Sequence, residues 1–141
     1  MADCILISNG GGGAGGSGDY IENTIETLSL SATVHNVPEA LQATLDPGVW
    51  YLNAGANYFA SSGSTGEDGS VILMTTDTYS SSDISNVIVG NTANAGGKMM
   101  RLVSVSTVVR LEETTTIYTD FFARGATAAR GLYFRAFKLS N

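Results

Sequence analysis

The segment at residues 103–111 constrains the fold most, because apolar and polar side chains alternate along it. One side of an extended chain carries five of its side chains, namely Val103, Val105, Thr107, Val109 and Leu111. The other side carries Ser104, Ser106, Arg110 and one apolar exception, Val108. Alternation with a period of two is typical of a strand with one face on a core and the other towards solvent or a neighbour. Further strands are needed to cover the apolar face.

Similar patterns predict strands at residues 27–35, 49–59, 70–78, 86–90, 115–122 and 131–139. In the first of these, Leu28 and Leu30 face one way and His35 falls on the polar face, where we expect a surface histidine. Gly55 suggests a bulge or bend within 49–59. Turns are expected at 46–48 and 112–114, and loops at 36–42, 60–69, 79–85, 91–97 and 124–130, with one helical turn at 39–42. About eight strands joined by small polar loops predict an all-β antiparallel sandwich or jelly roll.

Length and charge favour one domain with a weakly charged surface. The 141 residues suffice for a single core, and charged residues make up 14%, against about 25% in average soluble domains. Residues 1–97 hold ten acids and no Lys or Arg, whereas residues 98–141 hold all seven bases and three acids. We expect some of these bases to meet acids across the fold or a subunit boundary. Because the bases are dispersed, nucleic-acid binding is not indicated, and no apolar run has membrane-spanning length.

The first 18 residues differ from the rest. An apolar run, Cys4, Ile5, Leu6 and Ile7, precedes a glycine-rich tract at residues 10–18. Such a tract is typical of a flexible linker, so we expect an anchoring arm at 1–18 that docks on a partner or on its own trimer axis, and a β-domain at 19–141. A frayed tail is the alternative. The tract lacks the Lys-Ser/Thr ending of a phosphate-binding loop, and no secretory signal is evident, so we expect synthesis in the cytoplasm.

The sequence contains no catalytic constellation. The single cysteine, Cys4, excludes an internal disulfide and a zinc cage, and no pattern ties it to the single histidine, His35. No nucleophile elbow is present, and the acidic pair at 67–68 lacks the spaced ligands of a calcium loop. We therefore expect a non-enzymatic protein with no cofactor and no bound metal.

The last predicted strand is apolar on both faces. Leu132, Phe134 and Ala136 point one way, while the other face carries Tyr133, Arg135, Phe137 and Leu139. A strand of this kind is buried on both faces. In a chain of this size we expect the second face to meet another subunit.

Three motifs resemble C1q/TNF-like jelly rolls. They are S-T-V-V-R-L-E-E-T-T-T-I-Y at 106–118, P-G-V-W-Y-L-N-A-G-A-N-Y-F at 47–59 and G-L-Y-F-R-A-F-K-L at 131–139. The resemblance implies a compact homotrimer with the last strand at its centre. It thereby implies a trimer interface at Tyr133, Arg135, Phe137 and Leu139.

The opening M-A-D-C-I-L-I-S-N-G-G-G-G, with a β-knob behind it, resembles small virion proteins of tailed phages. That resemblance implies a capsid decoration (cement) or head-fibre protein on the virion surface. Its arm would dock through Cys4, Ile5, Leu6 and Ile7 on the major capsid protein or another virion protein. The chain has no shaft repeat, which favours decoration over a receptor-binding tail fibre.

The alternative is a tail-fibre or adhesin knob that binds a receptor or a host surface glycan. In that case aromatic side chains would be exposed as stacking platforms near the loops at 60–69 and 79–85. The candidates are Trp50, Tyr58 and Tyr79. Their burial or exposure discriminates between the two hypotheses.

Overall fold

The computed structural model describes residues 20–30, 34–60, 68–94, 100–124 and 126–141. These ranges form eight strands and one short 3-10 helix, η1 (Glu39–Leu41). The strands are β1 (Tyr20–Ser29), β2 (Ala43–Leu45), β3 (Gly48–Ala60), β4 (Asp68–Met74), β5 (Val87–Asn94), β6 (Met100–Leu111), β7 (Thr115–Arg124) and β8 (Ala126–Ser140). Within the described ranges no helix is both long and apolar enough to cross a membrane.

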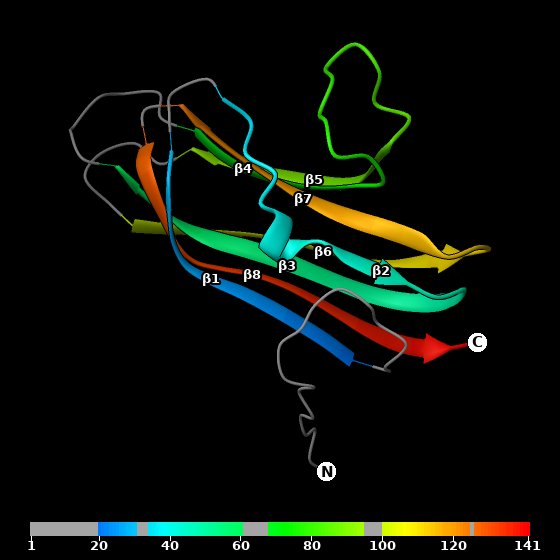
Figure 1. Cartoon of the computed structure of the whole chain (residues 1–141). Coiled ribbons are helices and arrows are strands. Elements are labelled where there is room, and N and C mark those ends of the chain that lie inside the picture. Colours follow the sequence, from blue (N-terminus) through cyan, green and yellow to red (C-terminus); the bar gives the residue numbers. More distant parts are fainter. Residues whose placement is uncertain (1–19, 31–33, 61–67, 95–99, 125) are drawn as a thin grey trace.

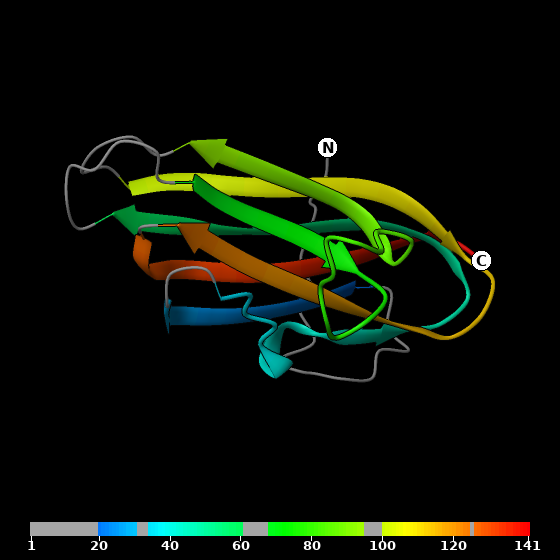
Figure 2. The same ribbon diagram turned by 90° about the horizontal axis from the view of Figure 1, so that it is seen from above.

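The strands form two four-stranded sheets, in the orders β1-β8-β3-β6 and β2-β7-β4-β5. Every pairing is antiparallel, and the first strand lies beside the last. Figures 1 and 2 show the sheets as two stacked layers, with the loop 75–86 rising from the outer side of β4 and β5. This is the predicted all-β jelly-roll sandwich.

The core lies between the two layers and follows the alternation of the sequence. On β6, Val103, Val105 and Leu111 are buried, whereas Val108 is 57% exposed, which confirms the reading of residues 103–111. The largest fully buried side chains come from both sheets: Trp50, Leu52 and Tyr58 on β3, Leu132 and Phe134 on β8, Val71 and Leu73 on β4, and Ile117 and Phe121 on β7. The inner faces of the two sheets interdigitate to form this core, and the alternate residues of each strand form an outer face on each sheet.

The first strand lies earlier than predicted. It spans Tyr20–Ser29, and residues 30, 34 and 35 lie outside any strand, so the prediction of a strand at 27–35 was wrong at these positions; residues 31–33 lie outside the described residues. The inner face of β1 includes Asn23, whose side-chain amide donates a hydrogen bond to the carbonyl oxygen of Gln42 at 3.1 Å. A buried polar residue satisfied in this way interrupts the apolar pattern that marks a strand.

The last strand is longer than predicted. It begins at Ala126, although residues 124–130 read as a loop, and Ala129 within it is fully buried. β8 pairs with β1 and β3, so backbone pairing on both sides determines its length. β4 ends at Met74, earlier than expected, and β5 extends to Asn94.

A bulge interrupts the pairing of β3 with β8 where Gly55 suggested one. Gly55 pairs with Tyr133 and Asn57 pairs with Arg130, so the extra residue lies on β8. Gly131 adopts φ of +59° at this point. A glycine in the left-handed region is typical of one class of β-bulge.

Candidate functional sites

An apolar row crosses the outer face of the sheet β1-β8-β3-β6. Strand register places four side chains directly opposite one another on successive strands, and we call these the apolar row: Tyr20, Phe137, Tyr51 and Val108. The rings of Tyr20 and Phe137 meet edge to face at 6.0 Å. Phe137 is 49% exposed and Tyr51 is 41% exposed. The row is thus a continuous apolar strip open to solvent in the isolated chain.

A polar row lies beside it on the same face, two residues along each strand. It consists of Glu22, Arg135, Asn53 and Ser106. Arg135 Nε donates to Glu22 Oε2 at 2.7 Å. This hydrogen bond, followed by that from the Tyr20 hydroxyl, holds the pKa of Glu22 below its usual value. The side chains of Arg135 and Glu22 are therefore held together as an ion pair beside the apolar row.

Tyr133 completes this face. The guanidinium carbon of Arg135 lies 4.4 Å from the centre of the Tyr133 ring, within the range of a cation–π contact. A Cβ at Gly55 would lie 2.7 Å from the Tyr133 hydroxyl, so the absence of a side chain at Gly55 leaves room for that ring. Tyr133, Arg135 and Phe137 thus share one sheet face, as expected, whereas Leu139 lies at a shift in the pairing of β8 with β3. The contact of these four residues with another subunit stays a prediction.

Two of the three predicted glycan contacts are wrong. Trp50 and Tyr58 are fully buried, because they share the inward parity of β3 with Leu52. Their polar atoms are satisfied inside: Trp50 Nε1 donates to the carbonyl oxygen of Asp46 at 2.9 Å, and the Tyr58 hydroxyl donates to that of Ser70 at 2.5 Å. Only Tyr79, in the loop 75–86, is partly exposed. The expected anchor residues Cys4, Ile5, Leu6 and Ile7 lie outside the described residues.

The structure pairs His35 with a buried carboxylate, which the sequence analysis did not foresee. His35 Nδ1 lies 2.7 Å from Asp120 Oδ2, and the two side chains are 33% and 0% exposed. Backbone hydrogen bonds between Asn36 and Phe121 hold the histidine segment against the edge of β7. Burial raises the pKa of Asp120, and the hydrogen bond and charge of His35 partly oppose that rise.

Aromatic rings enclose the imidazole. The rings of Tyr79 and Phe122 each stack on His35, with centroids 4.4 Å away and interplanar angles of 25° and 22°. His35 is therefore anchored through a carboxylate at one nitrogen and through its ring faces. These contacts hold the imidazole in place on the sheet β2-β7-β4-β5, opposite the apolar row.

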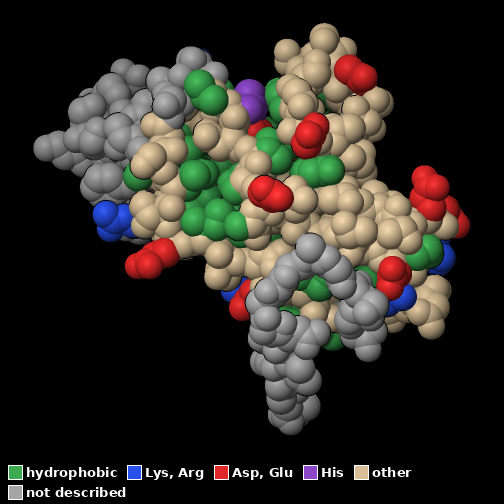
Figure 3. Space-filling view, viewed as in Figure 1, with side chains coloured by type: hydrophobic (Ala, Val, Ile, Leu, Met, Phe, Trp, Pro, Cys, Tyr) green, Lys and Arg blue, Asp and Glu red, His purple; other side chains and the backbone are tan. Residues whose placement is uncertain are grey.

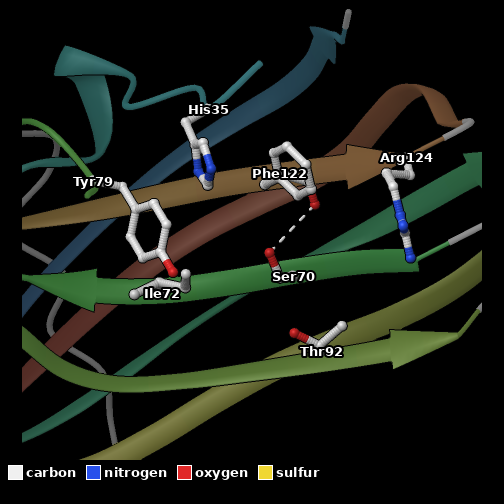
Figure 4. Close-up of a pocket in the computed structure, with 7 residues that line it drawn as sticks. All are labelled: His35, Ser70, Ile72, Tyr79, Thr92, Phe122 and Arg124. Atoms are coloured by element: carbon white, nitrogen blue, oxygen red, sulfur yellow. Dashed lines mark hydrogen bonds between the residues drawn. The ribbon is translucent and has the colours of Figure 1, made fainter. Parts of the chain in front are cut away.

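A cavity of about 350 Å³ opens beside this histidine (Figure 4). Its lining comes from β4, β5, β7, the loop 75–86 and the segment before η1: His35, Ser70, Ile72, Tyr79, Thr92, Phe122 and Arg124. In Figure 4 the three rings lie along one side, the hydroxyls of Ser70 and Thr92 lie across from them, and Arg124 lies at one end. Among the described residues, no three His, Cys, Asp or Glu side chains group into a metal site.

Charged side chains are otherwise dispersed. On the face shown in Figure 3, acidic and basic side chains are scattered and do not gather into one large patch. Arg135 pairs with Glu22, which lies 113 residues away, so the expectation that bases of the last part meet acids of the first part is confirmed for this one base.

No protein-family model and no curated protein matches the sequence. Among solved structures, the globular domain of a zebrafish complement 1qA protein matches with a TM-score of 0.61 at 14% identity, covering 88% of this chain and 100% of that one. The Eiger TNF of S. frugiperda gives a TM-score of 0.55 at 7% identity, over 87% and 94% of the two chains. A chain of the infectious bursal disease virus particle gives a TM-score of 0.52 at 13% identity, covering 86% of this chain and 32% of that one. The protein thus has the jelly-roll fold of C1q/TNF-like domains.

Proposed function

We propose that this protein is a non-enzymatic structural protein that forms a homotrimer through the outer face of the sheet β1-β8-β3-β6. We propose further that it belongs to a tailed-phage virion, as a head decoration (cement) or head-fibre protein on the virion surface. In this proposal residues 1–18 dock on the major capsid protein or another virion protein.

The apolar row carries the proposal. The described residues include seven exposed large hydrophobic side chains, and three of them lie in this row: Tyr51, Val108 and Phe137. A fourth, Leu102, lies on the same sheet face further along β6. Contiguous exposed apolar surface rimmed by polar residues marks an interaction site in soluble proteins. Aromatic and arginine side chains are also the types enriched at interface centres. The face therefore has the composition of an interface rather than of a solvated surface.

The number of copies rests on the resemblance to C1q/TNF-like jelly rolls, which implies a trimer with the last strand at its centre. In the present fold β8 is an inner strand of the sheet, between β1 and β3. That position favours a contact centred on Arg135 and Phe137. The weakly charged composition and the similarity in fold to a viral particle chain support the virion assignment.

The test is the mass of the full-length protein in solution, measured by light scattering after size exclusion. The wild type should have three times the 14.7-kDa chain mass. Phe137→Ala removes the central ring of the apolar row, and Arg135→Glu places a second carboxylate beside Glu22. Both variants should dissociate towards monomers, with at least about a tenfold weaker association.

Ile84→Ala is the matched control, because Ile84 is 67% exposed but lies in the loop 75–86, away from the apolar row. It should remain trimeric. All variants should retain the wild-type circular dichroism spectrum, since each altered side chain is on the surface. A monomeric wild type, or trimers of both Phe137→Ala and Arg135→Glu, would overturn the proposed interface.

A further inference from the structure

We propose that Glu22 controls assembly of the homotrimer: its ionised carboxylate neutralises Arg135 and lets the subunits associate, and loss of that charge separates them. This role rests on the proposed trimer and adds to it an ionisable group within the interface. Glu22 and Arg135 stand opposite each other on neighbouring strands of the sheet β1-β8-β3-β6.

The two side chains are the charged centre of one connected set. Arg135 Nε donates to Glu22 Oε2 at 2.7 Å, and the Tyr20 hydroxyl donates to the same oxygen at 2.9 Å. The ring of Tyr20 in turn meets that of Phe137 edge to face. The guanidinium of Arg135 lies over the ring of Tyr133. The carboxylate of Glu22 therefore links the apolar row to the arginine beside it.

In a single subunit this ion pair contributes little to stability. The side chains of Arg135 and Glu22 are 45% and 33% exposed. Water and salt screen the attraction in a pair of this exposure, and holding two long side chains in one geometry costs entropy. Removal of the Glu22 charge should therefore leave the subunit folded.

Burial in an interface changes this balance. A contact centred on β8 removes water from Arg135, and threefold symmetry places the same guanidinium on each of the three copies around the axis. A buried charge is costly unless it is paired, and removing one partner of a buried pair leaves the other uncompensated. Like charges also repel more strongly where water is excluded. Three Glu22–Arg135 pairs avoid both costs, because each pair is neutral.

Arg135 is the cation that compensates Glu22. Beyond it the polar row continues with Asn53 on β3 and Ser106 on β6, which carry no charge. The helix η1 also lies beside β1, and its one ionisable side chain, Glu39, is an exposed acid. The hydrogen bond from Arg135 is the largest of the effects that hold the pKa of Glu22 below its usual value. Association should therefore be tight at neutral pH and weaken as pH falls through this lowered pKa.

The experiment compares the association of full-length wild type and Glu22→Gln at neutral pH, by light scattering over a range of protein concentrations. Glutamine keeps the size of the side chain and removes its charge. We expect Glu22→Gln to associate at least about tenfold more weakly and to keep the wild-type circular dichroism spectrum. Glu26→Gln is the matched control, because it removes the same charge from an exposed position further along β1. It should associate like the wild type.

A charge exchange separates neutralisation from a purely structural role of Glu22. Arg135→Glu alone places two carboxylates together, whereas Glu22→Arg combined with Arg135→Glu restores a neutral pair. The double variant should associate at least about tenfold more tightly than Arg135→Glu. Acid provides a second readout. As pH falls from about 7 to 3, association of the wild type should weaken more steeply than that of Glu22→Gln.

Three results would overturn the role of Glu22. They are equal association of Glu22→Gln and the wild type at neutral pH, equal pH dependence of these two proteins, and a double variant that associates no better than Arg135→Glu. If the wild type is a trimer, each of them removes the role of Glu22 and leaves the proposed trimer in place. A monomeric wild type would overturn both.

Discussion

At the scale of single residues, the least expected feature is the buried carboxylate of Asp120. One of its oxygens accepts from His35, while Oδ1 finds no hydrogen-bond partner among the described residues. Sequence alone placed His35 on a surface and gave no partner for it. The contact joins residues 85 positions apart and depends on the bridge between Asn36 and Phe121. No local pattern encodes such a contact, although an isolated acid among the apolar residues of 117–122 is a signal worth noting.

The direction of the Asp120 shift predicts a pH effect on stability. Its pKa is raised in the folded state, so the folded protein holds this proton more tightly than the unfolded chain does. The resulting stabilisation is complete below the ordinary Asp pKa and is lost as pH rises through the raised value. We therefore expect the free energy of unfolding of the wild type, minus that of Asp120→Asn, to fall as pH rises from about 4 to 7. Urea unfolding at a series of pH values measures this difference.

Asp83→Asn is the control, because hydrogen bonds from Ser85 lower the pKa of the exposed Asp83. Its contribution is present above the ordinary Asp pKa and is lost as pH falls through the lowered value. The difference between the wild type and Asp83→Asn should therefore rise slightly with pH below about pH 4 and stay flat from about 4 to 7. A wild-type advantage over Asp120→Asn that grows with pH would show that the His35 contact outweighs burial.

At the scale of elements, alternation predicted the strands that have clean inner and outer faces. β3, β6 and β7 were found close to their observed bounds. Of the three, only β6 had its faces assigned, and two inward residues of β3, Trp50 and Tyr58, were expected to be exposed. The first part of β1 was missed because Asn23 stands at an inward position, and the start of β8 was missed because small residues such as Ala129 look like a loop. Both are cases in which tertiary pairing overrides local composition. The sequence could predict the shared face of Tyr133 and Phe137, but not the row they form with Tyr51, since that requires the strand register.

The bulge on β8 makes a specific prediction about Gly131. A Cβ there would meet only the side-chain nitrogen of Asn57, at 3.4 Å, but φ of +59° is unfavourable for any residue with a side chain. Gly131→Ala should therefore destabilise the fold by about 1–2 kcal/mol, seen as a lower urea midpoint with an unchanged slope. Gly90→Ala is the matched strand control, since it has no positive φ and its nearest neighbour is the Ile72 side chain at 3.3 Å. It should change stability by less than about 0.5 kcal/mol, and an equal loss in both variants would contradict a role for the bulge.

At the scale of the whole molecule, the two outer faces of the sandwich differ in character. One carries the apolar row, and the other carries a cavity with a cationic and aromatic lining. The fold class followed from alternation and loop composition, because burial of one strand face requires a second layer. The cavity beside His35 could not be predicted from the sequence, since its lining comes from five separate segments that only the completed topology brings together.

The arm gives the last prediction, which rests on the proposed docking of residues 1–18. Leu6→Asp places a charge in the apolar run that would be buried on the particle, where a leucine contributes about 1.5–3 kcal/mol. The full-length variant should keep the trimer mass but lose at least about tenfold in cosedimentation with purified capsids, the proposed partner. Asn9→Asp adds the same charge at a polar position just beyond the run and should bind like the wild type, which separates burial from net charge. Wild-type binding by Leu6→Asp would remove the arm as the anchor. A monomeric Leu6→Asp would instead mean that the arm holds the subunits together, so that the apolar row alone is insufficient for assembly.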